Sequence, residues 1–202
     1  MSIAFKPKLN YPRHLEYRSV KGFVNHVMYR ILMEASYGVI GDMIEFGVWR
    51  GATFNHVYKV SKDQNKRAHA VDSFIGLAQP DNESEARKFP KGAFNVGGSE
   101  WFIKKYPQAV VHAGFVPEVL SSIEEDVVFS FAHVDLDHER PTRQVLNWLW
   151  PKMSHRGILV CHDFYFDAKD CAPKAIEAWM KDNNLVYVMI ADHSIVFRKG
   201  DS

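Results

Sequence analysis

Residues 42–51 read DMIEFGVWRG, and this stretch decides the fold. Its first five residues are mostly apolar and have the length of a short buried strand, and Gly47 then permits a tight turn. Residues 52–61 continue with apolar side chains at helical spacing. A strand, a glycine-containing turn and a helix in direct succession predict the opening unit of an α/β fold.

The same alternation continues on both sides of this stretch. Helices are predicted at 20–37, 140–153 and 173–183, and further strands at 67–72, 109–112, 127–134 and 157–161. Residues 185–191 and 194–198 are predicted to close the chain as an antiparallel pair. The expected fold is α/β, with a doubly wound, Rossmann-like sheet that is mostly parallel and has an antiparallel C-terminal strand pair.

The composition bounds the class of protein. The 202 residues are 47% hydrophobic and 13% aromatic, which suits a globular domain with a sizeable core. A net charge of +1 lacks the basic excess of a nucleic-acid binder. No apolar run is long enough to span a bilayer, and the N-terminus lacks the apolar region of a secretory signal. Two cysteines, Cys161 and Cys171, make no disulfide framework. We therefore expect a cytoplasmic protein with no membrane or nucleic-acid partner.

We expect a single domain covering residues 1–202. Residues 1–40 are interpreted as an N-terminal leader and helix. Residues 79–98 form a polar, irregular segment that contains Gly92, Gly97 and Gly98. An irregular segment of this length in a compact domain is commonly functional, so 79–98 is predicted to be a lid loop.

Acidic residues follow four of the predicted strands. The fourth strand is the most conspicuous, because residues 131–142 read FAHVDLDHERPT and turn from apolar to charged within a few positions. Ligands of open α/β sheets bind beyond the carboxyl ends of the strands. The residues expected to converge on that edge are Glu45, Asp72, Asp135, Asp137, His162 and Asp163.

The turn after the first strand favours a cofactor without phosphates. Its glycines are spaced G-x-x-x-G, whereas a pyrophosphate is cradled by G-x-G-x-x-G. Glu45 would repel a phosphate and suits a cationic group. Asp72 follows Gly51 by about 20 residues, where an acid accepts hydrogen bonds from ribose hydroxyls. A nucleoside with a cationic tail and no phosphate is S-adenosylmethionine. The alternative is that Glu45 and Gly47 form an ordinary strand-to-helix turn.

Four sequence elements together resemble the macrocin O-methyltransferase (TylF-like) family. They are GDMIEFGVWRG at 41–51, DSFIGL at 72–77, DLD at 135–137 and HDF at 162–164. Gly114-Phe115, followed by PEVL at 117–120, is similar to the family's third-strand cofactor element. The resemblance runs in order from about Gly41 to the C-terminus. The family usually has paired aspartates where this chain has His162-Asp163, and a Tyr-Glu-Ser-Thr-like run where this chain has residues 138–142.

The resemblance implies a class I methyltransferase fold. It also implies methyl transfer to a hydroxyl, often on a sugar, with help from a divalent metal. The residues that the turn and the resemblance together place at the cofactor are Glu45, Phe46, Gly47, Arg50, Gly51, Asp72, Ser73, Phe74, Gly114, Phe115 and Asp135. Arg50 has an alternative role, pairing with an acid in the same turn.

Methyl transfer to oxygen needs a hydroxyl stripped of its proton, and the acids at 135–163 fit that chemistry. Asp135, His162 and Asp163 are the candidate metal ligands: oxygen-rich sites prefer magnesium, and an imidazole shifts the preference toward manganese or zinc. Asp137 is the candidate general base, and Asp135 could exchange roles with it. The alternative for the D-x-D pair is two solvated acids capping the helix from Arg140 onward.

Two other functions remain open from the sequence. One is a methyltransferase that acts on nitrogen or carbon without a metal. The other is a non-catalytic binding domain that keeps the fold, for which the His162 replacement and the altered run at 138–142 leave room. His138 is either a proton relay or substrate contact, or a surface turn residue. The acceptor, a sugar or another small molecule, is not identified by the sequence, and a homo-oligomer is compatible with it.

Overall fold

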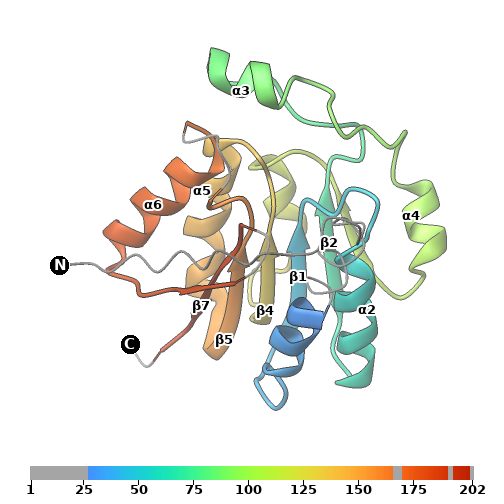
Figure 1. The fold of residues 1–202 in the computed structure, drawn as a ribbon. Helices are drawn as coiled ribbons and strands as arrows, with labels where there is room; N and C mark the ends of the chain where they lie inside the picture. Colours follow the sequence, from blue (N-terminus) through green and yellow to red (C-terminus); the bar gives the residue numbers. More distant parts are fainter. Residues whose placement is uncertain (1–26, 166–169, 191–192, 201–202) are drawn as a thin grey trace, which may run out of the picture.

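The computed structural model describes residues 27–165, 170–190 and 193–200 (Figure 1). This part of the chain forms a seven-stranded sheet in the order β3-β2-β1-β4-β5-β7-β6. The strands are β1 (Asp42–Phe46), β2 (Ala68–Asp72), β3 (Val110–Ala113), β4 (Phe129–Val134), β5 (Met153–Cys161), β6 (Val188–Met189) and β7 (Ile195–Arg198). The helices are α2 (Phe54–Asp63), α3 (Glu83–Lys88), α4 (Glu100–Lys105), α5 (Glu139–Leu149) and α6 (Ala172–Asp182), with short 3-10 turns η1 (Glu118–Ser122) and η2 (Trp150–Lys152). A helical segment at 27–34 precedes β1.

The strand pairing confirms the predicted fold class. Strands β1 to β5 pair in parallel, whereas β7 runs antiparallel to both β5 and β6. Strand β1 has β2 on one side and β4 on the other, so the strand order reverses at β1. In open α/β sheets this reversal point is where ligands bind, because the connections leave the sheet in opposite directions there.

The two faces of the sheet carry separate hydrophobic clusters, and β1 contributes to both. Ile44 and Phe46 pack with residues of α5 and α6, whereas Met43 packs on the other face with residues of α2 and of the segment 27–34. This division follows from the alternation of side chains along a strand. The helices therefore bury their apolar residues against the sheet. No helix in the described ranges is long and apolar enough to cross a membrane.

Several element boundaries differ from those predicted. Helix α5 ends at Leu149 rather than near 153 because Pro151 cannot continue the helix, and β5 starts at Met153. The segment 79–98, predicted to be irregular, contains α3, whose N-cap Asn82 accepts a hydrogen bond from the Glu85 N–H. This polar helix was not predicted because its sequence has no apolar residues at helical spacing. The predicted leader at residues 1–19, the predicted helix start at 20–26 and residue 191 of the predicted strand 185–191 lie outside the described residues.

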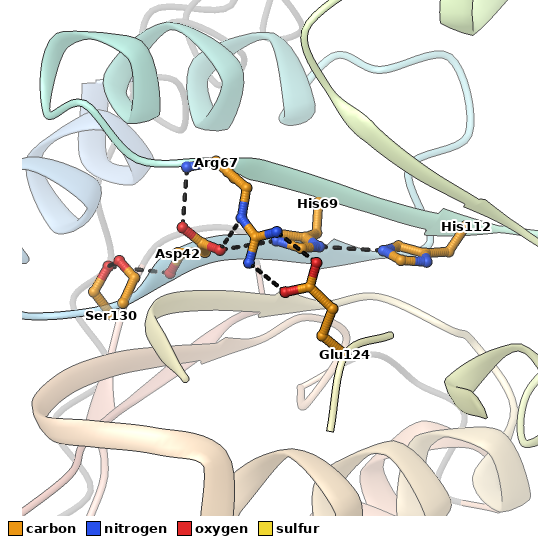
Figure 2. A network of polar contacts seen from close by, with 7 residues as sticks. Asp42, Arg67, His69, His112, Glu124 and Ser130 are labelled. Carbon is orange, nitrogen blue, oxygen red and sulfur yellow. Dashed lines mark hydrogen bonds and ion pairs between the residues drawn. The ribbon is translucent and has the colours of Figure 1, made fainter. Parts of the chain in front are cut away.

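A polar network joins the strands at the edge where β1 and β2 begin (Figure 2). The Asp42 carboxylate accepts hydrogen bonds from Arg67 Nε at 2.7 Å and pairs with His69 Nε2 at 3.1 Å. The Arg67 guanidinium also binds both oxygens of Glu124 at 2.8 Å. The chain of contacts continues from His69 Nδ1 to His112 Nε2 at 3.1 Å, so it links β1, β2, β3 and the residues after η1. The network lies at the opposite ends of these strands from the predicted ligand edge.

We expect this network to make stability depend on pH. Burial, and then the charge of His69, lower the pKa of His112 from 6.5 to about 4. Unfolded His112 therefore takes up a proton as the pH falls below about 6.5, while the folded state resists protonation until about 4, so stability falls across that window by about 1–3 kcal/mol. Chemical denaturation of His112→Gln should show a flatter pH dependence than wild type. Exposed His155→Gln is the control, and an unchanged slope in His112→Gln would refute the assignment.

Candidate active site

A cavity of about 410 Å³ opens at the carboxyl ends of β1 to β5. Residues at the end of each of these strands, or immediately after it, line the cavity wall. They are Gly47 after β1, Val71, Asp72 and Ser73 from β2, Gly114, Phe115 and Val116 after β3, Asp135, Leu136 and Asp137 after β4, and His162 and Asp163 after β5. The parallel arrangement thus brings together residues that are far apart in the sequence, as the strand-end acids predicted. The volume lies in the range of cofactor and small-molecule sites.

The backbone is strained at several points around this cavity. Trp49, Phe74, Asp137 and Asp163 have φ angles of 43°, 59°, 60° and 63°. Non-glycine residues seldom adopt this left-handed conformation, and it persists where the surroundings hold it in place. Such positions concentrate at functional sites, which supports a function for this edge of the sheet.

Gly47 is required by the close approach of two strand ends. A Cβ atom at Gly47 would lie 1.7 Å from the backbone oxygen of Asp135, and its φ of 81° is left-handed as well. The Gly47 N–H donates to Val71 at 2.9 Å, and the Asp135 N–H donates to Phe46 at 2.9 Å. Any side chain at position 47 would therefore push the β4 end, and with it Asp135, away from β1.

Asp72 is held rigidly at the edge of the cavity. Its Oδ2 accepts a hydrogen bond from the Trp49 N–H at 2.8 Å, and its Oδ1 accepts one from the Phe74 N–H at 2.7 Å. Each carboxylate oxygen can accept a second hydrogen bond, so the side chain keeps capacity for a ligand. A carboxylate fixed in this way is suited to binding a pair of neighbouring hydroxyls.

Asp135, His162 and Asp163 form a compact cluster on the opposite side of the site. His162 Nδ1 lies 2.9 Å from an Asp163 oxygen and 3.3 Å from an Asp135 oxygen. One potential ligand atom from each residue lies within 4.8 Å of the other two, close to the separation of ligands that share an ion. Two carboxylates and one imidazole match the donors that divalent cations such as Mg²⁺ or Mn²⁺ take, so the residues fit a metal site.

Asp137 lies next to this cluster but has a different environment. Its backbone oxygen accepts a hydrogen bond from the Ala172 N–H at 2.9 Å, which ties the strained turn to the start of α6. Burial, followed by the negative charges of Asp135 and Asp163, raises the pKa of Asp137 well above its usual range. A carboxylate with a raised pKa accepts a proton more readily near neutral pH, as a general base requires.

Five predicted cofactor residues do not line the cavity: Glu45, Phe46, Arg50, Gly51 and Phe74. Glu45 shares the sheet face of Met43 by strand alternation, is only 2% exposed, and receives His133 Nδ1 at 3.2 Å. The Glu45 carboxylate therefore lies against His133 and outside the cavity wall, and its contact with a cationic ligand stays a prediction. The Arg50 guanidinium lies 4.9 Å from the centre of the Trp49 ring, and its contact with the cofactor stays a prediction.

The remaining wall lies outside the residues assigned to the cofactor, the metal and the base, although one interpretation of His138 from the sequence is a proton relay or substrate contact. This remaining wall consists of Trp49, Gly76, Leu77, Ala78, Phe89, Phe94, His138 and Pro141. The Trp49 and Phe94 rings contact each other edge to face at a centroid distance of 5.6 Å. Phe89 and Phe94 belong to the segment 79–98, where no periodic pattern distinguishes a wall residue from a loop residue. His138 is 3% exposed, which excludes its interpretation as a surface turn residue.

The charges of the wall restrict the ligand. Four aspartates face the cavity, and no lysine or arginine among the described residues does. Phosphates need cationic side chains or a run of backbone N–H groups, so this wall disfavours nucleotide diphosphates. It suits a cationic or neutral ligand with hydroxyls, together with a bound cation.

The fold and this edge define a class I methyltransferase arrangement, and comparisons with known proteins agree. The chain belongs to the methyltransferase domain family, whose model matches residues 44–164. This span begins in β1 and ends just after the metal-binding candidates, so it includes every strand end that forms the cavity. The narrower macrocin family remains a prediction from the sequence elements. No curated protein sequence matches the chain.

Solved structures share the fold at low sequence identity. The O-methyltransferase NovP matches with a TM-score of 0.76 at 17% identity, covering 88% of this chain and 80% of NovP. The calicheamicin methyltransferase CalS11 matches with a TM-score of 0.75 at 19% identity, covering 89% and 80%. A structure of PaMTH1 from Podospora anserina with bound SAH matches with a TM-score of 0.58 at 12% identity, covering 93% and 83%. At these identities the likeness establishes the fold alone.

Proposed function

We propose that this chain is an S-adenosylmethionine-dependent O-methyltransferase that methylates a hydroxyl of a sugar or another small molecule, assisted by a divalent cation. The observation that carries the proposal is the acidic cavity, whose wall includes both the fixed Asp72 and the cluster of Asp135, His162 and Asp163. The fold matches to NovP and CalS11 are consistent with transfer to oxygen, and the resemblance to the macrocin family points to the same chemistry.

The cofactor is proposed to bind at the β1 and β2 ends. S-adenosylmethionine carries an electrophilic methyl group on a cationic sulfur and has no phosphate, which suits a wall rich in carboxylates. Asp72 would accept hydrogen bonds from the ribose hydroxyls, and the aromatic rings of Phe94 and Phe115 would shield the adenosine from water. The polar end of the cofactor would lie toward Gly47, where the turn leaves the backbone accessible.

The acceptor is proposed to bind between the cofactor and the acids that follow β4 and β5. A divalent cation held by Asp135, His162 and Asp163 would stabilise negative charge on the acceptor oxygen and orient it. Asp137 accepts the hydroxyl proton while the oxygen forms its bond to the methyl carbon and the carbon–sulfur bond breaks. The carboxylate oxygens of Asp135 and Asp163 would be the donors that hold the cation. The strained backbone at Asp137 and Asp163 fixes both carboxylates before the acceptor arrives.

The cofactor proposal predicts a large loss of affinity in Asp72→Ala. Removing hydrogen bonds to a charged group costs about 1.5–3 kcal/mol each, so the affinity for S-adenosylhomocysteine should fall at least about tenfold in calorimetric titrations. Because Asp72 also accepts the Trp49 and Phe74 N–H groups, this variant should lose some thermal stability. Asp126→Ala, which removes an exposed aspartate before β4, is the control. Wild-type affinity in folded Asp72→Ala would exclude Asp72 from the cofactor site.

A further inference from the structure

The segment 79–98 is anchored at its base and docked at its tip. At the base, the Leu77 N–H donates to Ala93 and the Gly92 N–H donates to Leu77, both at 2.9 Å. Between these anchors the chain extends to α3, which Figure 1 shows at one end of the molecule, set apart from the sheet. Phe89 and Phe94 from this segment form part of the cavity wall. The position of this segment therefore contributes to the shape of the cavity.

Glu85 of α3 is a buried carboxylate with an unusual partner. It is fully buried, and its Oε1 accepts a hydrogen bond at 2.8 Å from the N–H of Glu139, the first residue of α5. Its Oε2 accepts one at 3.0 Å from the Asp81 N–H. First-turn N–H groups have no partner within their own helix, and the helix dipole favours negative charge there. These contacts offset the cost of burying a carboxylate, and they join α3 to α5.

Two further contacts join the segment to the same short stretch. His138, the N-cap residue of α5, lies with Nε2 2.9 Å from the Phe89 carbonyl, which can only accept, so Nε2 carries the hydrogen. On the surface, Arg140 Nε pairs with Asp81 Oδ2 at 2.9 Å. All three contacts meet residues 138–140, which follow Asp137 directly. Because Asp137 adopts a left-handed backbone that its neighbours must hold, the docked segment supports the turn that carries it.

We infer that Glu85 is a positioning residue that fastens the segment 79–98 to the start of α5 and thereby holds Asp137 in its working orientation. The inference rests on the proposed function for the role of Asp137, whereas the fastening itself rests on the contacts of Glu85 alone. Loss of the bond from the Glu139 N–H to Glu85 would remove one of the three contacts at residues 138–140 and weaken the support of the turn at Asp137. The fastening of the segment is thus coupled to the orientation of the proposed general base.

The fastening is tested by amide hydrogen exchange in the wild-type protein. An N–H in the first turn of a helix normally exchanges quickly because it lacks an intrahelical partner. The Glu139 amide should instead be protected, and Glu85→Gln should speed its exchange by about tenfold or more, since the variant loses a charged hydrogen bond. Glu83→Gln removes the same charge from an exposed position of α3 and should leave the exchange unchanged. A fast Glu139 amide in wild type would overturn the fastening without bearing on methyl transfer.

The coupling to Asp137 is tested by the kinetics of the same two variants. Glu85→Gln should lower kcat by about tenfold while the affinity for S-adenosylhomocysteine stays within about threefold, because the cofactor contacts lie at Asp72. A general loss of folding would lower both quantities and the thermal midpoint together. If exchange at Glu139 rises but kcat does not change, Glu85 is a structural residue and the positioning role is wrong. If wild type transfers no methyl group while the exchange result holds, only the proposed function fails.

Discussion

Asp137→Asn should slow methyl transfer by about 10² to 10⁴, the usual contribution of a positioned general base. The substitution keeps the shape of the side chain but leaves no group that can take the hydroxyl proton. The pKa of Asp137 is raised first by burial and then by the charges of Asp135 and Asp163, and a raised pKa favours uptake of the hydroxyl proton. Single-turnover rates with saturating cofactor and acceptor measure the chemical step.

The position of the loss identifies the role of Asp137. Cofactor affinity and cation affinity should both stay close to wild type, because the candidate ligands are Asp135, His162 and Asp163. Asp126→Asn provides the matched control at an exposed site. An Asp137→Asn rate within about twofold of wild type would transfer the base role to Asp135, the alternative that the sequence leaves open.

Asp163→Ala should abolish methyl transfer while leaving cofactor binding intact. Asp163 contributes an oxygen to the three-residue cluster and lies 2.9 Å from His162 Nδ1, so its removal takes away one donor and the nearer of the two carboxylates beside the imidazole. Excess chelator applied to wild type should have the same effect. Titration with S-adenosylhomocysteine, followed in parallel with the methyl-transfer assay, separates the two functions because Asp72 lies outside the cluster.

A second variant distinguishes a metal ligand from a structural carboxylate. His162→Asp keeps a donor at the same position and makes the set all-oxygen, which magnesium prefers. The activity of His162→Asp should therefore be highest with Mg²⁺. Wild type, which has the imidazole, should show a stronger preference for Mn²⁺ than this variant. Full wild-type activity in excess chelator, with an identified acceptor, would exclude the cation and leave the carboxylates to act alone.

The convergence of the acidic strand-end residues could be predicted from the sequence. Parallel strands end at one edge, so Asp72, Asp135 and Asp163 converge whatever the details of packing. The same reasoning does not bring Glu45 into the cavity wall, because proximity to a strand end does not decide which face a side chain takes. Alternation along β1 places Glu45 with Met43, where it pairs with His133 across to β4.

The parts that the sequence did not predict depend on tertiary contacts. Helix α3 is short and polar. It is stabilised by the Asn82 cap and by the hydrogen bond that its own Glu85 accepts from the first residue of α5, rather than by an apolar stripe. Local propensity carries no record of such contacts. The sequence leaves His138 either a proton relay or substrate contact or a surface turn residue, and the structure places it buried against Phe89. The contacts between the segment 79–98 and the start of α5 are therefore visible only in the three-dimensional structure.

The most direct test of the account is the anomalous difference map of a crystal grown with S-adenosylhomocysteine and Mn²⁺. The account predicts a manganese peak enclosed by Asp135, His162 and Asp163, next to cofactor density whose ribose hydroxyls meet Asp72. This single map examines the claim that one edge of the sheet binds a phosphate-free nucleoside cofactor beside a cation. A cofactor in the cavity with no manganese peak at the cluster would contradict the metal-assisted mechanism, and density for neither would contradict the proposed function itself.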